Sequence, residues 1–138
     1  MPYNNGTMQN YPLLYKMREL IKLSKLYLDH APKSEKYTSV QKIKQLEWDI
    51  YLLIVEVLKR YHKRTTLTEL DIKHEQLRCA WQLYYELGYL AFKDGQNSHD
   101  KAYENHRFAA INRLLDEVGA MIGGWIKVEK EAFNNQKI

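Results

Sequence analysis

The sequence of 138 residues is long enough for one domain with a single hydrophobic core. Its hydrophobic content of 45% and charged content of 28% are typical of a soluble globular protein. The longest uncharged apolar run, residues 50–55, is far too short to span a bilayer. The single cysteine, Cys79, excludes an internal disulfide and a cysteine-based zinc site. No charged-then-apolar leader opens the sequence, so we expect a cytoplasmic protein.

The placement of the charges is more informative than their sum. The formal net charge is +4, and the sequence pI is about 9.0. Residues 1–65 contain 12 lysines and arginines against 6 acidic residues, whereas residues 66–138 contain 9 against 11. A positive N-terminal half favours an anionic partner, although a moderately basic protein need not bind one.

Only six glycines and three prolines interrupt the sequence, which predicts a few long helices. Residues 1–10 are polar and turn-rich, and we expect a flexible tail there. The first helix is predicted over residues 11–30 and ends before Pro32, because proline cannot continue a helix. Its core stripe consists of Leu13, Met17, Leu20, Ser24, Tyr27 and Ala31, widened by Leu14, Ile21 and Leu28.

The second helix is predicted over residues 38–63, with Ser34 or Ser39 as its cap. Its core stripe consists of Val40, Ile43, Ile50, Ile54, Val57 and Tyr61. A second apolar stripe, about 120° away around the helix, consists of Trp48, Tyr51, Leu52 and Val55. A surface helix of a monomeric bundle needs a stripe only slightly wider than about 100°. We therefore expect the second helix to contact something beyond its own bundle.

The third helix has the same excess of apolar surface. A turn over residues 64–67 leads into it, Thr66 or Thr68 starts it, and it runs to about Lys93, with Gly95 as its stop. The predicted core residues are Leu70, Leu77, Ala80, Trp81, Tyr84, Leu87 and Ala91. Nearly opposite lie Ile72, Cys79, Leu83 and Leu90, and a third apolar group consists of Tyr85, Tyr89 and Phe92. This helix is also predicted to be buried on more than one face.

The fourth helix is predicted to start at Asn97 or Ser98 and to end near Phe133, with a flexible tail over residues 134–138. Its core stripe consists of Phe108, Ile111, Leu115, Val118, Ile122 and Ile126, with Leu114, Met121 and Trp125 on one shoulder. Gly119 and Gly123 lie on the other shoulder. A glycine inside a helix costs about 1 kcal/mol relative to alanine. We therefore expect another helix backbone to come close there, the alternative being a poorly formed helix end.

Two segments resemble a known family. The segment Glu117-Val118-Gly119, followed by Ile122-Gly123-Gly124-Trp125-Ile126, is similar to the last helix of the Avd family. The loop Pro32-Lys33-Ser34-Glu35-Lys36-Tyr37 is similar to that family's first interhelical loop, which also occurs in relatives from rRNA intervening sequences. Avd proteins are accessory proteins of diversity-generating retroelements, within a broader group of bacterial four-helix-bundle proteins. The resemblance covers about residues 10–130.

The predicted architecture is all-α: an antiparallel up-down-up-down four-helix bundle over residues 11–133. The two helices with excess apolar surface predict an oligomer, because large contiguous apolar patches are uncommon on monomers. The resemblance implies a closed ring of five copies. It also implies binding to a reverse transcriptase and to a structured template RNA, in support of error-prone cDNA synthesis.

No arrangement of residues indicates catalysis, a cofactor or a metal site. His99 and His106 are seven residues apart and align on one helical face, but a metal site needs further ligands, and we expect solvated histidines. Cys79 has only Arg78 as a basic neighbour and is predicted to be an inert packed thiol. We expect a protein that is not an enzyme.

Basic residues are the better candidates for function, and they form two groups. The first group closes the second helix and consists of Lys59, Arg60, Lys63 and Arg64. The second group follows one face of the first helix and consists of Arg18, Lys22 and Lys25. Such surfaces bind phosphate backbones without reading sequence. The alternative for the first group is that it only complements the negative end of the helix dipole.

These observations favour a non-catalytic scaffold that holds a reverse transcriptase and an RNA, with DNA as the alternative nucleic acid, through phosphate contacts. The alternative is a protein-interaction module, like the bundle proteins of rRNA intervening sequences, that binds no nucleic acid.

Overall fold

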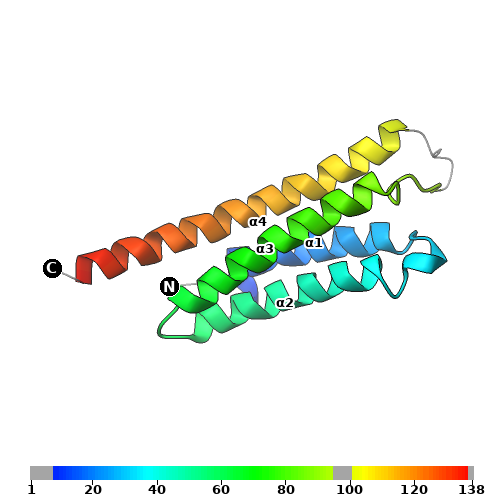
Figure 1. Cartoon of the computed structure of the whole chain (residues 1–138). Coiled ribbons are helices and arrows are strands. Elements are labelled where there is room, and N and C mark those ends of the chain that lie inside the picture. Colours follow the sequence, from blue (N-terminus) through cyan, green and yellow to red (C-terminus); the bar gives the residue numbers. More distant parts are fainter. Residues whose placement is uncertain (1–7, 95–100, 137–138) are drawn as a thin grey trace.

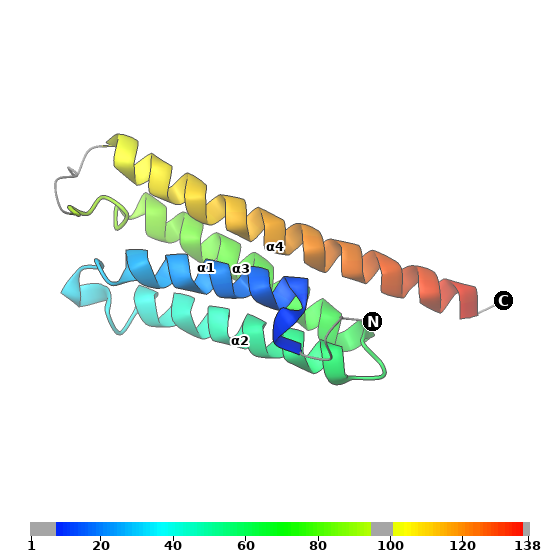
Figure 2. The same cartoon turned by 180° about the vertical axis from the view of Figure 1, so that it is seen from behind.

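A computed structural model describes residues 8–94 and 101–136, which contain helices and no β-strand. The four long helices are α1 (Pro12–Leu28), α2 (Ser39–Lys59), α3 (Arg64–Glu86) and α4 (Lys101–Gln136). Successive helices run in opposite directions and lie side by side (Figures 1 and 2). Each helix packs on its neighbour in the chain and α1 also packs on α4, which closes the bundle. The predicted four-helix bundle is confirmed.

Short 3-10 turns precede α1 and α2, at Met8–Asn10 and Lys33–Glu35. The helix α1 begins at Pro12, whose missing N–H and fixed φ suit the first position of a helix. It ends at Leu28, two residues before the predicted end, because the N–H groups of His30 and Ala31 bond three residues back in a tight turn before Pro32. Neither predicted serine caps α2 from the N-cap position.

The connection between α2 and α3 lies earlier than predicted. The helix α2 ends at Lys59, because Arg60 adopts an extended backbone with φ −79° and ψ 142°. The helix α3 already begins at Arg64, so residues 60–63 form the loop. This correction moves Tyr61 out of the predicted core stripe and into the loop, where its side chain is 91% exposed.

The helix α3 ends at Glu86, well before the predicted end at Lys93. Gly88 has a positive φ of 85°, and the N–H groups of Gly88 and Tyr89 bond to the carbonyls of Tyr85 and Tyr84. This pair of bonds is the Schellman motif, which ends a helix at a left-handed glycine. The predicted stop at Gly95 and the predicted caps Asn97 and Ser98 lie outside the described residues.

The segment after α3 leaves the helix at the Gly88 turn and packs its side chains on the core. Leu90 is therefore fully buried, and Phe92 is nearly so. The buried Arg107 of α4 donates hydrogen bonds to the carbonyl oxygens of Leu90 (2.7 Å) and Phe92 (2.9 Å). The His30 ring stacks on the Phe92 ring with 4.3 Å between centroids. These contacts tie the end of α3 to both α4 and the end of α1.

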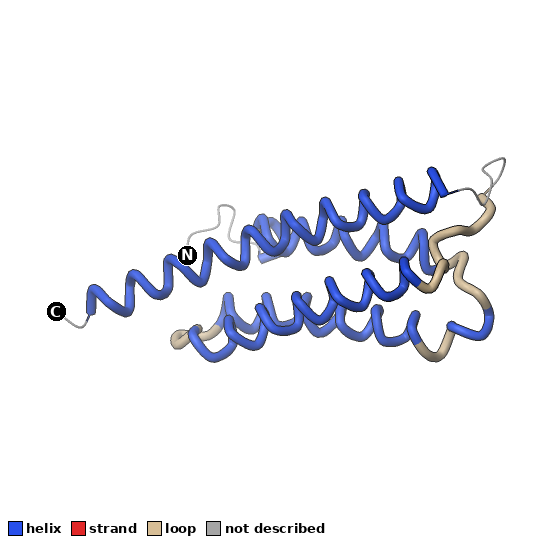
Figure 3. Tube along the Cα trace, turned by 45° about the horizontal axis from the view of Figure 1, so that its top comes forward, coloured by secondary structure: helices blue, strands red, loops and turns tan. Residues whose placement is uncertain are grey.

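The core consists of one stripe from each helix, as the 3.6-residue periodicity predicts. On α4 the buried stripe includes Ile111, Leu115, Val118 and Ile122. The last turns of α4 run to Gln136, beyond the predicted end, and project past the other three helices (Figure 3). Two predicted core residues are corrected: Tyr61, described above, and Leu87, which lies at the end of α3 and is 52% exposed.

Candidate nucleic-acid and partner interface

The first basic group surrounds the α2–α3 loop, at the end of the bundle where α4 projects. Lys59 is the last residue of α2 and is exposed, without an ion pair to any described residue. The Nε atom of Arg60 lies 3.0 Å from Oε2 of Glu56 in an exposed ion pair. The Arg64 guanidinium lies 4.9 Å from the centre of the Phe133 ring, which joins the loop to α4.

Lys63 is used differently from its neighbours. Its ammonium group donates hydrogen bonds to the carbonyl oxygens of Val57 (2.6 Å) and Arg60 (2.5 Å). The Val57 carbonyl lies in the last turn of α2, at the negative end of the helix dipole, and Arg60 directly follows the helix. The sequence left open that the first basic group only complements the helix dipole, and Lys63 is used in this way. Lys59, Arg60 and Arg64 keep exposed side chains that can reach a ligand.

The second basic group lies along α1, and its three members differ in their surroundings. Arg18 is half-buried and donates a hydrogen bond to the Tyr51 hydroxyl at 3.3 Å. Lys25 forms an exposed ion pair with Asp29, with 2.8 Å between Nζ and Oδ2. This hydrogen bond lowers the pKa of the Asp29 carboxyl. Lys22 is exposed and forms no ion pair with a described residue, so it is the most available cation of this group.

The second apolar stripe of α2 lies outside the core, as predicted. Trp48 and Leu52 are 56% and 57% exposed, while Tyr51 and Val55 are half-buried. The Trp48 ring meets the Tyr51 ring edge to face, with 6.3 Å between centroids. Since Tyr51 also contacts Arg18, this patch lies on the side of α2 that faces α1. We call these four residues the α2 patch.

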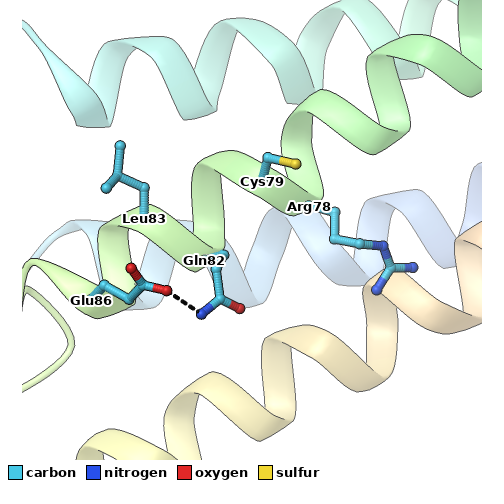
Figure 4. Close-up of a pocket in the computed structure, with 5 residues that line it drawn as sticks. All are labelled: Arg78, Cys79, Gln82, Leu83 and Glu86. Carbon is cyan, nitrogen blue, oxygen red and sulfur yellow. Dashed lines mark hydrogen bonds between the residues drawn. The ribbon is translucent and has the colours of Figure 1, made fainter.

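A separate apolar patch lies along the exposed part of α3 next to α2. Ile72 and Leu83 are 54% and 56% exposed, and Cys79 between them is exposed as well, not packed as predicted. Figure 4 shows Cys79 and Leu83 on the edge of α3 that faces α2, beside a shallow hollow of about 330 Å³. We call Ile72, Cys79 and Leu83 the α3 patch. Leu90, which the sequence assigned to this face, belongs to the core because α3 ends before it.

Polar residues separate the two patches. The carboxylate of Asp49 on α2 accepts a hydrogen bond from the Gln45 amide at 2.9 Å and lies 3.4 Å from Nζ of Lys73 on α3. Asp49 lies about 100° around α2 from Trp48, on the side that faces α3. The chain therefore presents two apolar patches on different helices, not one continuous surface.

The glycines of α4 have two different environments. A Cβ atom built on Gly119 would lie 2.7 Å from Cε1 of His74, so the side chain of this α3 residue packs directly against the glycine. A Cβ atom on Gly123 would meet nothing within 4 Å. The predicted close approach of another backbone is thus not what fills either position: the His74 side chain occupies the space at Gly119, and nothing of the single chain lies near Gly123. Trp125 is buried and packs on the Tyr11 ring with 5.5 Å between centroids.

A carboxyl group lies inside the bundle. Glu47 of α2 is only 2% exposed, and burial raises its pKa to about 8. The Ser24 hydroxyl and the Trp81 indole N–H are close enough to oppose this rise in pKa. Neither forms a hydrogen bond of normal geometry, so Ser24 Oγ, Trp81 Nε1 and Glu47 Oε2 lack partners. A protonated carboxyl is the form that such a site favours near neutral pH.

The model of the bAvd-like family matches residues 13–129 of the sequence. The chain belongs to the bAvd-like family. The matched range contains both basic groups, both apolar patches and the glycines of α4, and it ends before the last projecting turns of α4. Neither the comparison with curated proteins nor that with solved structures returned a match.

Sequence reasoning missed several features of this bAvd-like chain. The exposed ring of Tyr61 followed from the extended backbone at Arg60, for which the sequence offers no marker. The capping role of Lys63 also required the loop geometry. Within residues 8–94 and 101–136, no group of His, Cys, Asp and Glu side chains is placed to hold a metal ion. In the same ranges, no helix combines the length and apolar content that crossing a bilayer requires.

Proposed function

We propose that this bAvd-like protein is a cytoplasmic, non-catalytic scaffold of a diversity-generating retroelement. In this role it binds the element's reverse transcriptase and its template RNA and supports mutagenic cDNA synthesis. Membership of the bAvd-like family supports an accessory role. The observation that carries RNA binding is the set of exposed cations, Lys59, Arg60 and Arg64, around a loop at one end of the bundle.

The proposed scaffold is a closed ring, with five copies as the resemblance to Avd proteins implies. A ring needs two different, complementary surfaces on each copy, because each copy contacts its two neighbours head to tail. The α2 patch and the α3 patch are two such surfaces on different helices. A ring would repeat the basic loop once per copy and multiply the net charge of +4 carried by one chain. Such an array attracts phosphate backbones through counterion release.

RNA affinity measured over a range of salt concentrations tests this function. The wild-type protein should bind RNAs of unrelated sequence with an affinity that falls steeply with salt. Replacing Lys59, Arg60 and Arg64 together by Gln should weaken binding and flatten the log–log slope by about two units, at roughly 0.7 per phosphate contact for single strands. Lys63 is left unchanged because it caps α2.

A variant with Lys22 and Lys25 replaced by Gln is the matched control on α1. If only this variant loses RNA binding, the proposed function stands and the RNA site lies on α1. A wild-type affinity that does not change with salt would contradict a nucleic-acid role. So would a result in which neither variant weakens RNA binding. The exposed apolar patches would then favour the alternative, a protein-interaction module that binds no nucleic acid.

A further inference from the structure

The α2–α3 loop presents an aromatic ring to solvent. Tyr61 is 91% exposed, more than any other large apolar side chain among the residues that the structure describes. The His62 ring stands edge-on to it, with 4.8 Å between centroids and 87° between planes. The Tyr61 ring is therefore accessible to another planar group.

The loop that carries Tyr61 is held in place from both sides. Lys63 bonds back to the carbonyls of Val57 and Arg60 at 2.6 and 2.5 Å. The Arg64 guanidinium lies over the Phe133 ring of α4. A loop that is already fixed loses little conformational entropy when a ligand binds to it.

The surroundings of Tyr61 are cationic. Lys59, Arg60 and Arg64 are exposed within three residues of it in the chain, and the carboxylate of Glu56 is paired with Arg60. Protein–protein interfaces are depleted of lysine around their aromatic centres. An aromatic ring among cations is instead what proteins use to bind single-stranded nucleic acids, with bases on the ring and phosphates on the charges.

We propose that this loop binds an unpaired RNA nucleotide, with its base stacked on Tyr61 and the adjacent phosphates on Lys59, Arg60 and Arg64. The inference rests on the proposed function and narrows its ligand to single-stranded RNA. A duplex uses the faces of its bases for its own stacking, so it offers this surface only its phosphates.

Fluorescence anisotropy with a labelled oligo(U) RNA and an RNA duplex of equal strand length tests the inference. Tyr61→Ala should weaken oligo(U) binding by about five-fold or more, since stacking of one base contributes at least about that factor. The salt slope of oligo(U) binding and the duplex affinity should stay unchanged. Tyr61→Trp should keep the affinity for oligo(U).

Tyr37→Ala is the matched control. Tyr37 is 80% exposed, and Nζ of Lys36 lies 5.5 Å from the centre of its ring, in the connection between α1 and α2. This variant should bind oligo(U) like the wild type. Circular dichroism should show unchanged helix content in every variant, because both tyrosines lie outside the core.

Three results would overturn the inference: no loss in Tyr61→Ala, an equal loss on the duplex, or an equal loss in Tyr37→Ala. In each of these cases, a steep salt dependence of the wild type would leave the proposed RNA binding standing. Binding of the wild type that shows no salt dependence would overturn both.

Discussion

The imidazole of His74 occupies the space into which a side chain at Gly119 would project. A Cβ atom on Gly119 would lie 2.7 Å from Cε1 of the ring. The ring cannot move away easily, because it is buried and its Nε2 atom lies 2.8 Å from the carbonyl oxygen of Leu115. The ring thus fills the space between α3 and α4 that the missing side chain of Gly119 leaves.

We predict that Gly119→Ala destabilises the protein. Displacing the ring breaks its hydrogen bond and strains the core, at about 1–3 kcal/mol. Alanine's better helix propensity offsets about 1 kcal/mol of this. Urea unfolding at fixed protein concentration should therefore show a lower midpoint. A higher midpoint would contradict this strain, because it would mean that His74 moves aside for less than the roughly 1 kcal/mol gained in helix propensity.

Gly123→Ala is the control on the same helix, and the opposite sign is expected. The new methyl group meets nothing within 4 Å, so only the gain in helix propensity remains, up to about 1 kcal/mol. The urea midpoint should rise. A lower midpoint would indicate that another copy of the chain packs against Gly123.

The buried carboxyl of Glu47 predicts a dependence of stability on pH. Its folded pKa of about 8 lies above the value of 4.5 for a free carboxyl. The unfolded chain thus loses this proton first, and the free energy of unfolding decreases as pH rises from about 4.5 to about 8. Glu47→Gln has no carboxyl to ionise, so its free energy of unfolding should not show this decrease. The variant should therefore be more stable than the wild type near pH 9, by roughly 3–5 kcal/mol at most.

Near pH 5 the same variant and the wild type should differ little, because the wild-type carboxyl is then protonated in the folded state. Thermal unfolding of both proteins across this pH range measures the difference directly, and other titrating groups cancel in the comparison. Two parallel curves would show that Glu47 does not titrate between these pH values.

Helical periodicity predicted the core well wherever the chain stays helical. The stripe Ile111, Leu115, Val118 and Ile122 needs only a regular helix, and all four residues are buried. The same argument failed at Tyr61 and Leu90, because it extended α2 and α3 beyond their ends. Gly88 was the available marker for the end of α3, but an isolated glycine reveals its positive φ only in the folded chain.

The candidate site was predictable as a set of residues but not as a set of roles. The helical wheel placed Trp48 and Leu52 outside the core, and both are exposed. Charge patterning alone treated Lys59 and Lys63 as equivalent, whereas only Lys63 reaches the carbonyls of α2. Which cation caps a helix depends on the path of the loop, and local sequence does not determine that path.

The different roles of these two lysines predict different stabilities. Lys63→Gln removes a charged donor from two C-terminal carbonyls and should cost about 1–2 kcal/mol. Lys59→Gln removes an exposed charge that forms no ion pair with any residue the structure describes. It should change stability by less than about 0.5 kcal/mol. Urea unfolding of the two single variants distinguishes them, and equal effects would contradict the capping role of Lys63.

The last prediction concerns how copies of the chain meet. In a head-to-tail ring, the α2 patch of one copy covers the α3 patch of the next. Leu52→Glu and Leu83→Glu should each abolish the assembly, because a carboxylate buried in an apolar contact is strongly unfavourable. Both variants should keep their helix content, since these leucines are 57% and 56% exposed in the single chain.

A mixture of the two variants makes the test specific. Each variant retains one intact patch, and these two patches are complementary, so the mixture should form a heterodimer that cannot grow further. Light scattering should then give twice the mass of one 16.5 kDa chain for the mixture and the single mass for each variant alone. If instead each patch pairs with its own kind, either variant alone will still dimerise through its intact patch and the mixture will add nothing. A wild-type mass of one chain at micromolar concentration would contradict any such assembly.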